Sequence, residues 1–417
     1  MPLALGAAVR ADFPLFEAHP SAVYLDTGAT SQRPARVIDA EADFVRRDYA
    51  AVHRGSSMAT GEATWAFERA RERVADFVGV GEREIVWTQN ATDALNMIAL
   101  GMADASVGLG DERFALHPGD EIVITEAEHH ANLIPWQRLA AKTGAVLRWV
   151  SVDERGLWSL DGISEIVGDR TRLIAFAHVS NVTGQIAPVA DIVEIARRVG
   201  AFTVLDACQS APHIPLDLHA LGVDFAAFSA HKMLGPTGIG ALYGREDLLD
   251  AFPPARTGGS MITVVSMEAA EFLPAPNRFE AGTQAVSQAV GFGAAVDYLA
   301  SLGMDAVAEH EHEVAQALVE AVERTPGVRL IGPAAGEYRA ALASFIVDGV
   351  HAHDVGQFLD DAGVAVRVGH HCAQPLHRRF GVAATARASA AVYTTDEEVA
   401  VFREALAGVR AFFGVED

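Results

Sequence analysis

Residues 202–232, FTVLDACQSAPHIPLDLHALGVDFAAFSAHK, contain the two strands that decide the fold. The apolar runs Phe202–Leu205 and Phe225–Phe228 are each followed by polar residues. Asp206 follows the first run and Lys232 follows the second, about one strand–helix unit further on. Strands joined by such units run parallel, so we expect both polar ends to meet at the carboxyl edge of a sheet, where open α/β folds carry their function.

The same alternation of short apolar runs and helical patterns extends to both sides of this stretch. The predicted strands are Glu84–Thr88, Glu121–Thr125, Leu147–Val152, Arg172–Ala177, Phe202–Leu205, Phe225–Phe228 and Gly240–Tyr243. The predicted helices between them are Glu62–Val78, Thr92–Met102, Leu133–Thr143 and Val189–Val199, and Asp104–Pro118 is a predicted loop. The sequence therefore predicts an α/β fold, with a mostly parallel seven-stranded sheet covered by helices on both faces.

The pattern changes after about residue 290. Long helical patterns at Gln284–Leu302 and Asp305–Arg324 are followed by strands at Ala343–Val347 and Val364–Val368 and by a helix at Glu397–Phe412. We therefore predict a large domain over residues 25–290 and a smaller α+β C-terminal domain over residues 291–417. Residues 1–24 are predicted to form an arm that packs on the small domain.

The bulk composition excludes several classes of function. The 32 Lys and Arg against 55 Asp and Glu give a net charge of −23, which disfavours binding to nucleic acid or to an anionic membrane. Two cysteines without a CxxC pair cannot form a disulfide framework or a cysteine-based metal site. Arg10 and Asp12 interrupt the apolar N-terminus, and polar residues interrupt the uncharged stretch Leu173–Ala190, so neither a signal peptide nor a membrane span is predicted. We expect a cytoplasmic protein.

Lysine is scarce in this sequence, which has only Lys142 and Lys232. Lys232 lies past a predicted strand, between His231 and the turn Gly235–Gly238, where a lysine can form a Schiff base with a carbonyl cofactor. Asp206 closes the preceding strand, and an acid there can pair with the protonated pyridine nitrogen of pyridoxal phosphate (PLP). The alternatives are a surface lysine and a helix cap, and the spacing of the two residues favours the cofactor site.

Two further segments follow predicted strands. Asn90–Asp93 opens a helix, where free N–H groups and a hydroxyl suit a phosphate, although an ordinary helix cap has the same sequence. Glu128–Asn132 supplies histidines that could stack on a cofactor ring or bind a metal. Because no second set of ligands accompanies them, no metal site is predicted.

Residues 367–373, RVGHHCA, place three basic residues beside a cysteine: Arg367, His370, His371 and Cys372. A free cysteine is often a buried apolar residue, but positive neighbours favour the thiolate form. Cys208 lacks such neighbours and is interpreted as structural. Arg387 could form a surface ion pair, or its planar fork could bind a substrate carboxylate.

Together these motifs resemble those of the group II, SufS-type cysteine desulfurases, in the aminotransferase class V family with PLP fold type I. The resemblance extends from Leu25 to the C-terminal helix. It rests on four segments in order, Glu128–Asn132, Asp206–Gln209, Ser229–Gly235 and Arg367–Ala373. The Arg-x-Gly-His-His-Cys-Ala form is that of group II, since group I enzymes have a longer cysteine loop.

The resemblance implies a role for each site residue. Lys232 would be the Schiff-base lysine, Cys372 would receive the sulfur and His129 would stack on the PLP ring. The other implied cofactor ligands are Asp206 at the pyridine nitrogen, Gln209 at the ring hydroxyl, Thr92, Ser229 and His231 at the phosphate, and Thr283 at the phosphate of the second subunit of a homodimer. The implied substrate residues are Arg387, at the carboxylate, Asn181 and His53. Ala91 stands where a hydroxyl residue is common, so one phosphate contact is expected to be missing.

The implied reaction converts L-cysteine to L-alanine, leaves a persulfide on Cys372 and passes the sulfur on for iron–sulfur cluster assembly. Alternatives are a selenocysteine lyase or another PLP lyase or epimerase of the same fold. Intact Lys232, Asp206, Cys372 and Arg387 argue against a non-catalytic sulfur-transfer scaffold. The resemblance also implies a zinc-bound scaffold protein as acceptor, whose zinc His353 could bind. The alternative for His353 is an ordinary helix start.

Overall fold

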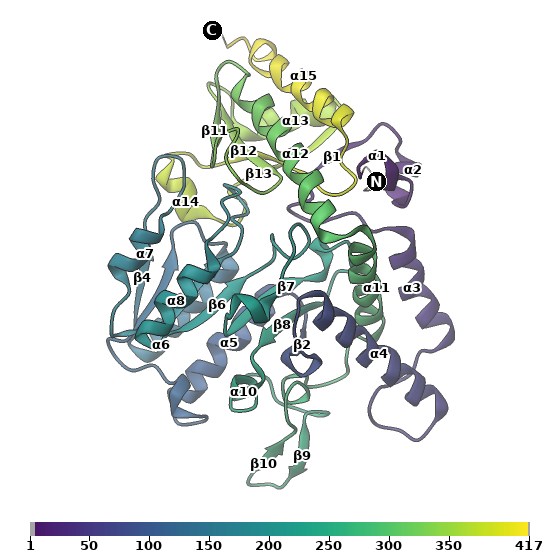
Figure 1. Cartoon of the computed structure of the whole chain (residues 1–417), viewed down its shortest axis with the longest axis vertical. Helices are drawn as coiled ribbons and strands as arrows, with labels where there is room; N and C mark the ends of the chain where they lie inside the picture. The colour runs from purple at the N-terminus through teal and green to yellow at the C-terminus, as the bar shows by residue number, and fades with distance from the viewer. Residues whose placement is uncertain (1–4, 416–417) are drawn as a thin grey trace.

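The computed structural model describes residues 5–415, and all seven predicted strands of the large domain form one sheet (Figure 1). These strands are β2 (Ile85–Thr88), β3 (Glu121–Thr125), β4 (Val146–Val150), β5 (Thr171–Ala177), β6 (Phe202–Asp206), β7 (Phe225–Ser229) and β8 (Gly240–Gly244). They pair in the order β2-β8-β7-β6-β5-β3-β4. The strands from β7 to β4 are parallel, and β8 is antiparallel to both β7 and β2. The predicted mostly parallel seven-stranded sheet is confirmed.

Fifteen α-helices are described for residues 5–415. They are α1 (Ala7–Arg10), α2 (Pro14–Ala18), α3 (Ala35–Arg47), α4 (Met58–Phe77), α5 (Ala91–Ala105), α6 (Ile134–Thr143), α7 (Leu160–Ile166), α8 (Val189–Val199), α9 (Leu218–Leu221), α10 (Glu246–Leu249), α11 (Val286–Leu302), α12 (Met304–Glu323), α13 (Ala352–Asp361), α14 (Gln374–Arg379) and α15 (Asp396–Phe412). Short 3₁₀ helices are η1 (Glu82–Glu84), η2 (Glu112–Phe114), η3 (His130–Asn132), η4 (Ala230–Lys232) and η5 (Asn277–Phe279).

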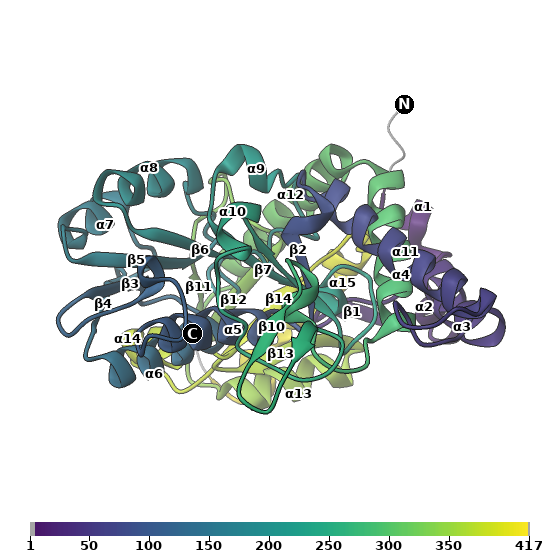
Figure 2. The same cartoon turned by 90° about the horizontal axis from the view of Figure 1, so that it is seen from below.

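The central strands of the large sheet are buried on both faces, as the residues of β5 show. Leu173 and Ala175 join the core that contains α5 and α6, whereas Ile174 and Phe176 join the core that contains α4, α8 and α11. Figure 2 shows α8 and α9 on one side of the sheet and α5 and α6 on the other. A strand buried on both faces needs apolar side chains at every position, which is why these strands are continuous apolar runs in the sequence.

A second sheet of five strands forms the upper part of the molecule in Figure 1. Its strands are β1 (Val23–Leu25), β11 (Val328–Ile331), β12 (Leu342–Val347), β13 (Val364–Gly369) and β14 (Thr385–Ser389), in the order β1-β13-β14-β12-β11. Only β1 and β13 pair in parallel. The small α+β unit of the predicted fold class is confirmed.

The N-terminal segment packs against the C-terminal part of the chain. Arg10 forms an ion pair with Glu398 at 2.8 Å, and the rings of Phe13 and Tyr393 lie 4.8 Å apart. However, β1 runs across residues 24 and 25, and α11 runs across residues 290 and 291. The proposed domain boundaries at these positions stay predictions.

One hairpin was not expected from the sequence. Strands β9 (Ile262–Val265) and β10 (Ala270–Phe272) form a two-stranded sheet that projects from the lower end of the molecule in Figure 1. In addition, the predicted loop Asp104–Pro118 contains the end of α5 and η2.

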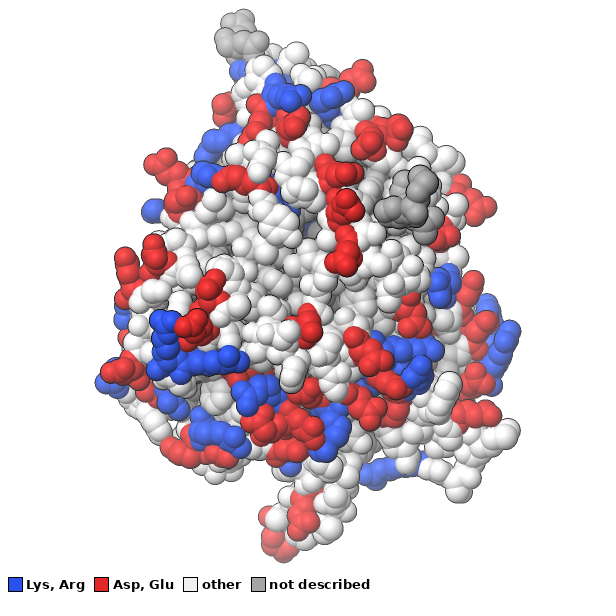
Figure 3. Space-filling model, viewed as in Figure 1, with Lys and Arg blue, Asp and Glu red and all other residues white. Residues whose placement is uncertain are grey.

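Charges on the face drawn in Figure 3 are interspersed, with Lys and Arg next to Asp and Glu over much of its lower half. Among residues 5–415, no single helix is both long and apolar enough to span a membrane. Helices α11 and α12 reach that length and composition only as a pair, which is bent by 77°.

Candidate active site

A cavity of about 450 Å³ lies at the carboxyl ends of β3, β5, β6 and β7, next to the loop that joins β13 to α14. Ten of the predicted site residues line it, namely Thr92, His129, Asn181, Asp206, Gln209, Ser229, His231, Lys232, Cys372 and Arg387. His53 and Thr283 do not. The fold thus brings together residues that are up to about 300 positions apart in the sequence.

One end of the cavity is the N-terminus of α5, which suits a phosphate. The Asn90 side chain accepts the N–H of Asp93 at 2.9 Å, and Ser229 Oγ accepts the N–H of Ala91 at 2.9 Å. Thr92 contributes an exposed hydroxyl beside these N–H groups. Burial, with a smaller effect of Lys232, lowers the pKa of His231 to about 4, so its ring is neutral at pH 7. An anion here would meet a helix N-terminus, hydroxyl groups and a neutral imidazole.

The middle of the cavity holds a carboxylate and an amine on neighbouring strands. Asp206 ends β6, is only 6% exposed and accepts the N–H of Cys208 at 3.0 Å on its Oδ1. Within the described part of the chain, no Lys, Arg or His forms an ion pair with Asp206. Lys232 lies on η4 after β7. A buried acid without a protein counter-ion fits a ligand that brings a positive charge, as a pyridinium nitrogen does.

His129 precedes η3 at one side of the cavity. Its Nδ1 accepts the N–H of Ala131 at 3.0 Å, so the proton of the neutral ring is on Nε2. Burial and then Lys232 lower the pKa of His129. Beneath it, Glu128 accepts bonds from Thr125 and Asn132, both at 2.6 Å, and burial raises the pKa of Glu128 to about 7.

Gln209 and Asn181 connect the cavity wall to other segments. Gln209 Nε2 donates to Gly28 O at 2.9 Å, which leaves its second N–H and its oxygen for a ligand. Asn181 Nδ2 donates to His371 O at 2.8 Å and so contacts the cysteine loop directly.

In the cysteine loop, which joins β13 to α14, His371 differs from the expectation that it is a positive neighbour of Cys372. Burial, and then the charge of Arg387, lower the pKa of His371 to about 2, and its Nε2 is hydrogen-bonded to Thr385 Oγ1 at 2.9 Å. His371 is therefore neutral and does not provide Cys372 with a positive neighbour. The sequence could not show this, because the charge of a histidine depends on its burial.

Arg387 is 2% exposed, in the middle of β14. Its Nη1 donates to Asn181 O at 2.8 Å, its Nη2 lies 3.7 Å from Asp26 Oδ1, and its Nε is without a protein partner among the described residues. Burial lowers the pKa of Arg387 to about 10, with Asp26 opposing, so the guanidinium stays charged at pH 7. A Cβ on Gly28 would lie 2.9 Å from Nη2, so any larger residue at position 28 would press on the guanidinium.

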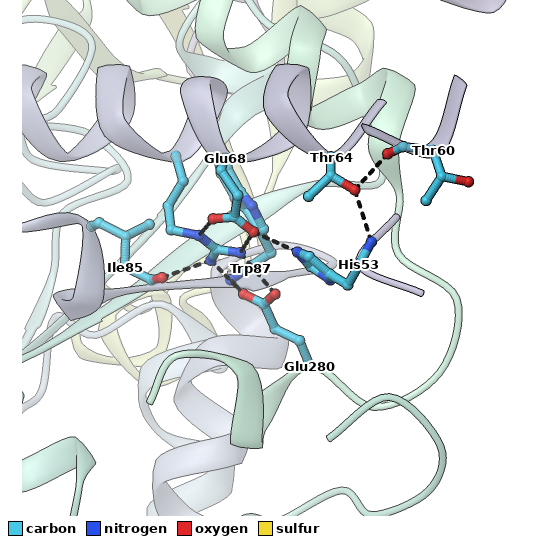
Figure 4. A network of polar contacts seen from close by, with 8 residues as sticks. His53, Thr60, Thr64, Glu68, Ile85, Trp87 and Glu280 are labelled. Atoms are coloured by element: carbon cyan, nitrogen blue, oxygen red, sulfur yellow. Dashed lines mark hydrogen bonds and ion pairs between the residues drawn. The ribbon is translucent and has the colours of Figure 1, made fainter. Parts of the chain in front are cut away.

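His53 does not line the cavity of this chain, and its place on the substrate side stays a prediction. Its Nε2 pairs with Glu68 Oε1 at 2.7 Å, and Glu68 also binds Arg71 (Figure 4). Buried Arg71 in turn holds both oxygens of Glu280, at 2.6 and 2.9 Å. Burial raises the pKa of Glu68, but its bonds to His53 and Arg71 outweigh burial and lower that pKa to about 2.

Several lining residues were not predicted as ligands, among them Gly28, Cys208 and Arg367. Asp26 does not line the cavity but lies 3.7 Å from Arg387 Nη2. The signal for Gly28 was its place in Asp26-Thr27-Gly28, directly after a short apolar run. Cys208 was interpreted as structural, yet it lines the cavity. Burial, and then the charge of Asp206, raise the pKa of its thiol.

Thr283 is exposed near Glu280, and its role in a second subunit stays a prediction. Residues 5–415 contain no group of three or more His, Cys, Asp or Glu that could hold a metal ion.

Comparisons with known proteins agree with this geometry. The aminotransferase class V family model matches residues 23–402. A probable cysteine desulfurase 2 of Mycobacterium leprae is 54% identical, over 98% of both chains. The apo structure of a cysteine desulfurase from Thermococcus onnurineus is 37% identical, with a TM-score of 0.91 over 97% of this chain and 98% of that one. The structure of the Escherichia coli cysteine desulfurase CsdA, in an S-sulfonic acid form, is 35% identical with a TM-score of 0.87 over the same shares. The chain therefore belongs to the aminotransferase class V family, among its group II cysteine desulfurases.

Proposed function

We propose that Lys232 of this PLP-dependent cysteine desulfurase holds the cofactor before substrate binds, that Arg387 binds L-cysteine, and that the persulfide forms on Cys372. The observation that carries the proposal is the convergence of Lys232, Asp206 and Cys372 on one cavity of about 450 Å³. The cavity also fits the cofactor, since it combines an anion site at α5 with the unpaired carboxylate of Asp206. PLP, when bound, links to an amine through its aldehyde and withdraws electrons from the α-carbon of the substrate.

The protein's own residues then have distinct tasks. Arg387 binds the substrate carboxylate through Nε and Nη2 while Nη1 stays on Asn181 O. Once the amine of L-cysteine has replaced it, the free amine of Lys232 would take the α-proton, and neutral His129 would contact the cofactor ring from the cavity wall. Cys372 Sγ attacks the sulfur of the substrate, so that an S–S bond forms as the C–S bond breaks. The electron pair of the broken bond stays on the substrate carbon, which takes up a proton and leaves as alanine.

The identity of the lysine is tested by reduction with borohydride followed by peptide mapping. PLP should be fixed to Lys232, and the protein should release alanine and sulfide from L-cysteine in the presence of a thiol reductant. A label on Lys142 would contradict the assignment. Comparing L-cysteine with L-selenocysteine under identical conditions decides whether selenocysteine lyase activity accompanies desulfuration.

A homodimer is part of the proposal. Val264, Val265 and Met267 on the β9–β10 hairpin are 58%, 60% and 96% exposed. The N–H of Gly282 donates to Gly259 O at 2.9 Å, which ties the Thr283 segment to the base of this hairpin. Exposed apolar side chains beside that segment support a second subunit there, with Thr283 reaching its phosphate. Sedimentation of the purified protein tests the assembly.

The sulfur acceptor is proposed to be a zinc-bound scaffold protein of iron–sulfur assembly, in the cytoplasm. The ring of His351 caps α13 by accepting the N–H of His353 at 3.2 Å, whereas the ring of His353 is exposed. An exposed imidazole on the helix before β13 could replace one thiolate ligand of the zinc. His353→Ala should keep desulfuration with a chemical reductant and lose stimulation by the scaffold. Full stimulation of the variant would leave His353 as part of an ordinary helix start.

A further inference from the structure

The cysteine loop between β13 and α14 is held in an unfavourable backbone conformation. His371 has φ of 48° and Cys372 has φ of 56°, so two consecutive residues other than glycine lie in the left-handed region. Residues with a Cβ adopt this region only where the surrounding structure imposes it. Contacts from outside the loop must therefore hold Cys372 where it is.

The connection after β3 provides two such contacts through one residue. The backbone N–H of His130 donates to Cys372 O at 2.6 Å. The backbone N–H of Gln374 donates to His130 Nε2 at 3.1 Å. Gln374 is the first residue of α14, whose first N–H groups have no partner within the helix. The His130 ring therefore caps α14 from another part of the chain, and the two bonds grip the loop on either side of Ala373.

The ring of His130 can accept this bond only when Nε2 carries no proton. Burial, and then His370, whose ring centre is 5.4 Å away, lower the pKa of His130. The lowered pKa favours the neutral imidazole, and because Nε2 accepts the N–H of Gln374, the single proton of the neutral ring is on Nδ1. His129, the neighbouring residue, has a different task, because its ring lines the cavity and that of His130 does not.

We propose that His130 is a positioning residue that clasps the cysteine loop and so fixes Cys372 for attack on the substrate sulfur. The inference rests on the proposed function, because it assumes that Cys372 is the attacking thiol. A clasp has two consequences. Loosening it slows the attack, since Sγ spends less time in position, and it exposes Cys372 to reagents that the closed loop keeps out.

The test compares three variants of the full-length PLP-loaded protein. His130→Phe keeps an aromatic ring and the backbone N–H but removes the acceptor. His130→Gln offers a carboxamide oxygen as a replacement acceptor. His117→Phe is the matched control, because His117 is an exposed histidine whose ring pairs with Glu112 at 3.1 Å, away from the cysteine loop.

Two rates are measured for each variant. The first is the burst of alanine from one turnover without reductant, which reports the attack by Cys372. The second is the rate at which a bulky maleimide modifies Cys372, with peptide mapping to separate it from Cys208. For His130→Phe we expect the burst to slow, and the maleimide reaction to accelerate, by about two- to tenfold, the effect of one neutral hydrogen bond. The KM for L-cysteine should not change, and His130→Gln should recover towards the wild type.

A His130→Phe variant with wild-type burst and maleimide rates would overturn the proposal. A slower burst without a faster maleimide reaction would also overturn the proposal, because the His130 ring would then affect the reaction without holding the loop. If the wild type releases no alanine, the proposed function fails, and the maleimide rates still decide whether His130 holds the loop. His117→Phe should match the wild type in both rates.

Discussion

The strongest test of the substrate site is the replacement Arg387→Lys, which keeps the charge and removes the planar fork. In the structure, Nη1 is occupied by Asn181 O at 2.8 Å, and Nε and Nη2 are left for the two oxygens of a carboxylate. An ammonium group donates from a single point, so it cannot hold Asn181 O and both carboxylate oxygens together.

The loss amounts to one hydrogen bond between charged groups, about 1.5–3 kcal/mol. Since each 1.4 kcal/mol is a factor of ten, the KM for L-cysteine should rise by about 10- to 150-fold. Arg387 holds the carboxylate before and during the reaction, so kcat should change much less than KM. Alanine release, measured over a range of L-cysteine concentrations with excess reductant, gives both constants.

Arg198→Lys is the matched control. Arg198 is an exposed arginine on α8 that pairs with Glu194 one turn away, and a lysine can replace it there. This variant should have wild-type constants. Unchanged KM and kcat in Arg387→Lys would place the guanidinium outside the substrate site. A fall in kcat at constant KM would mean that Arg387 acts on the transition state and not on substrate binding.

Three further outcomes are expected. The Cys372→Ser variant should bind L-cysteine, seen as a change in visible absorption, but release no alanine. The Cys208→Ala variant should keep most of the activity. Equal losses of activity in the two variants would contradict the separate roles of the two thiols. Burial raises the pKa of Glu128 from 4.5 to about 7, so its contribution to stability is present below pH 4.5 and is lost as the pH rises to 7. Between pH 4.5 and 7, the free energy of unfolding of the wild type, measured with urea, should therefore fall by up to about 3 kcal/mol relative to that of Glu128→Gln. A difference between the two proteins that does not change with pH would refute the raised pKa. Met267→Asp, at a side chain that is 96% exposed, should shift sedimentation towards a monomer without loss of secondary structure, and an unchanged dimer would exclude the hairpin tip from the interface.

Sequence patterns were sufficient for most of the large sheet because its central strands are buried on both faces. A short unbroken apolar run such as Phe225–Phe228 predicts a buried strand. The observed strand β7 is one residue longer than the predicted one and ends at Ser229. The small sheet was harder to predict. Strand β14, Thr385–Ala386-Arg387-Ala388-Ser389, has no large apolar side chain, and its central position is the buried arginine. Strand β1 has only three residues, too few for a periodic pattern.

The candidate site was predictable where a residue type is tied to a strand end. Lys232 and Asp206 follow strands, and the fold brings both to the cavity. The charge of His371 and the place of His53 depend on burial and on distant partners such as Thr385 and Glu68. The contact of His130 with α14 likewise joins segments about 240 residues apart, and nothing local in the sequence indicates it.

The pairing of β1 with β13 has a consequence for how the protein is made. Val23 pairs with Val364, about 340 residues later in the chain. At the usual 5–20 residues per second, a ribosome needs roughly 20–70 s to synthesise the chain between them. During that time the large sheet can form from contiguous residues, but the apolar edge of β1 has no partner. Nascent chains interrupted before β13 should therefore be captured by chaperones through their N-terminal segment and should resist proteolysis only within the large sheet.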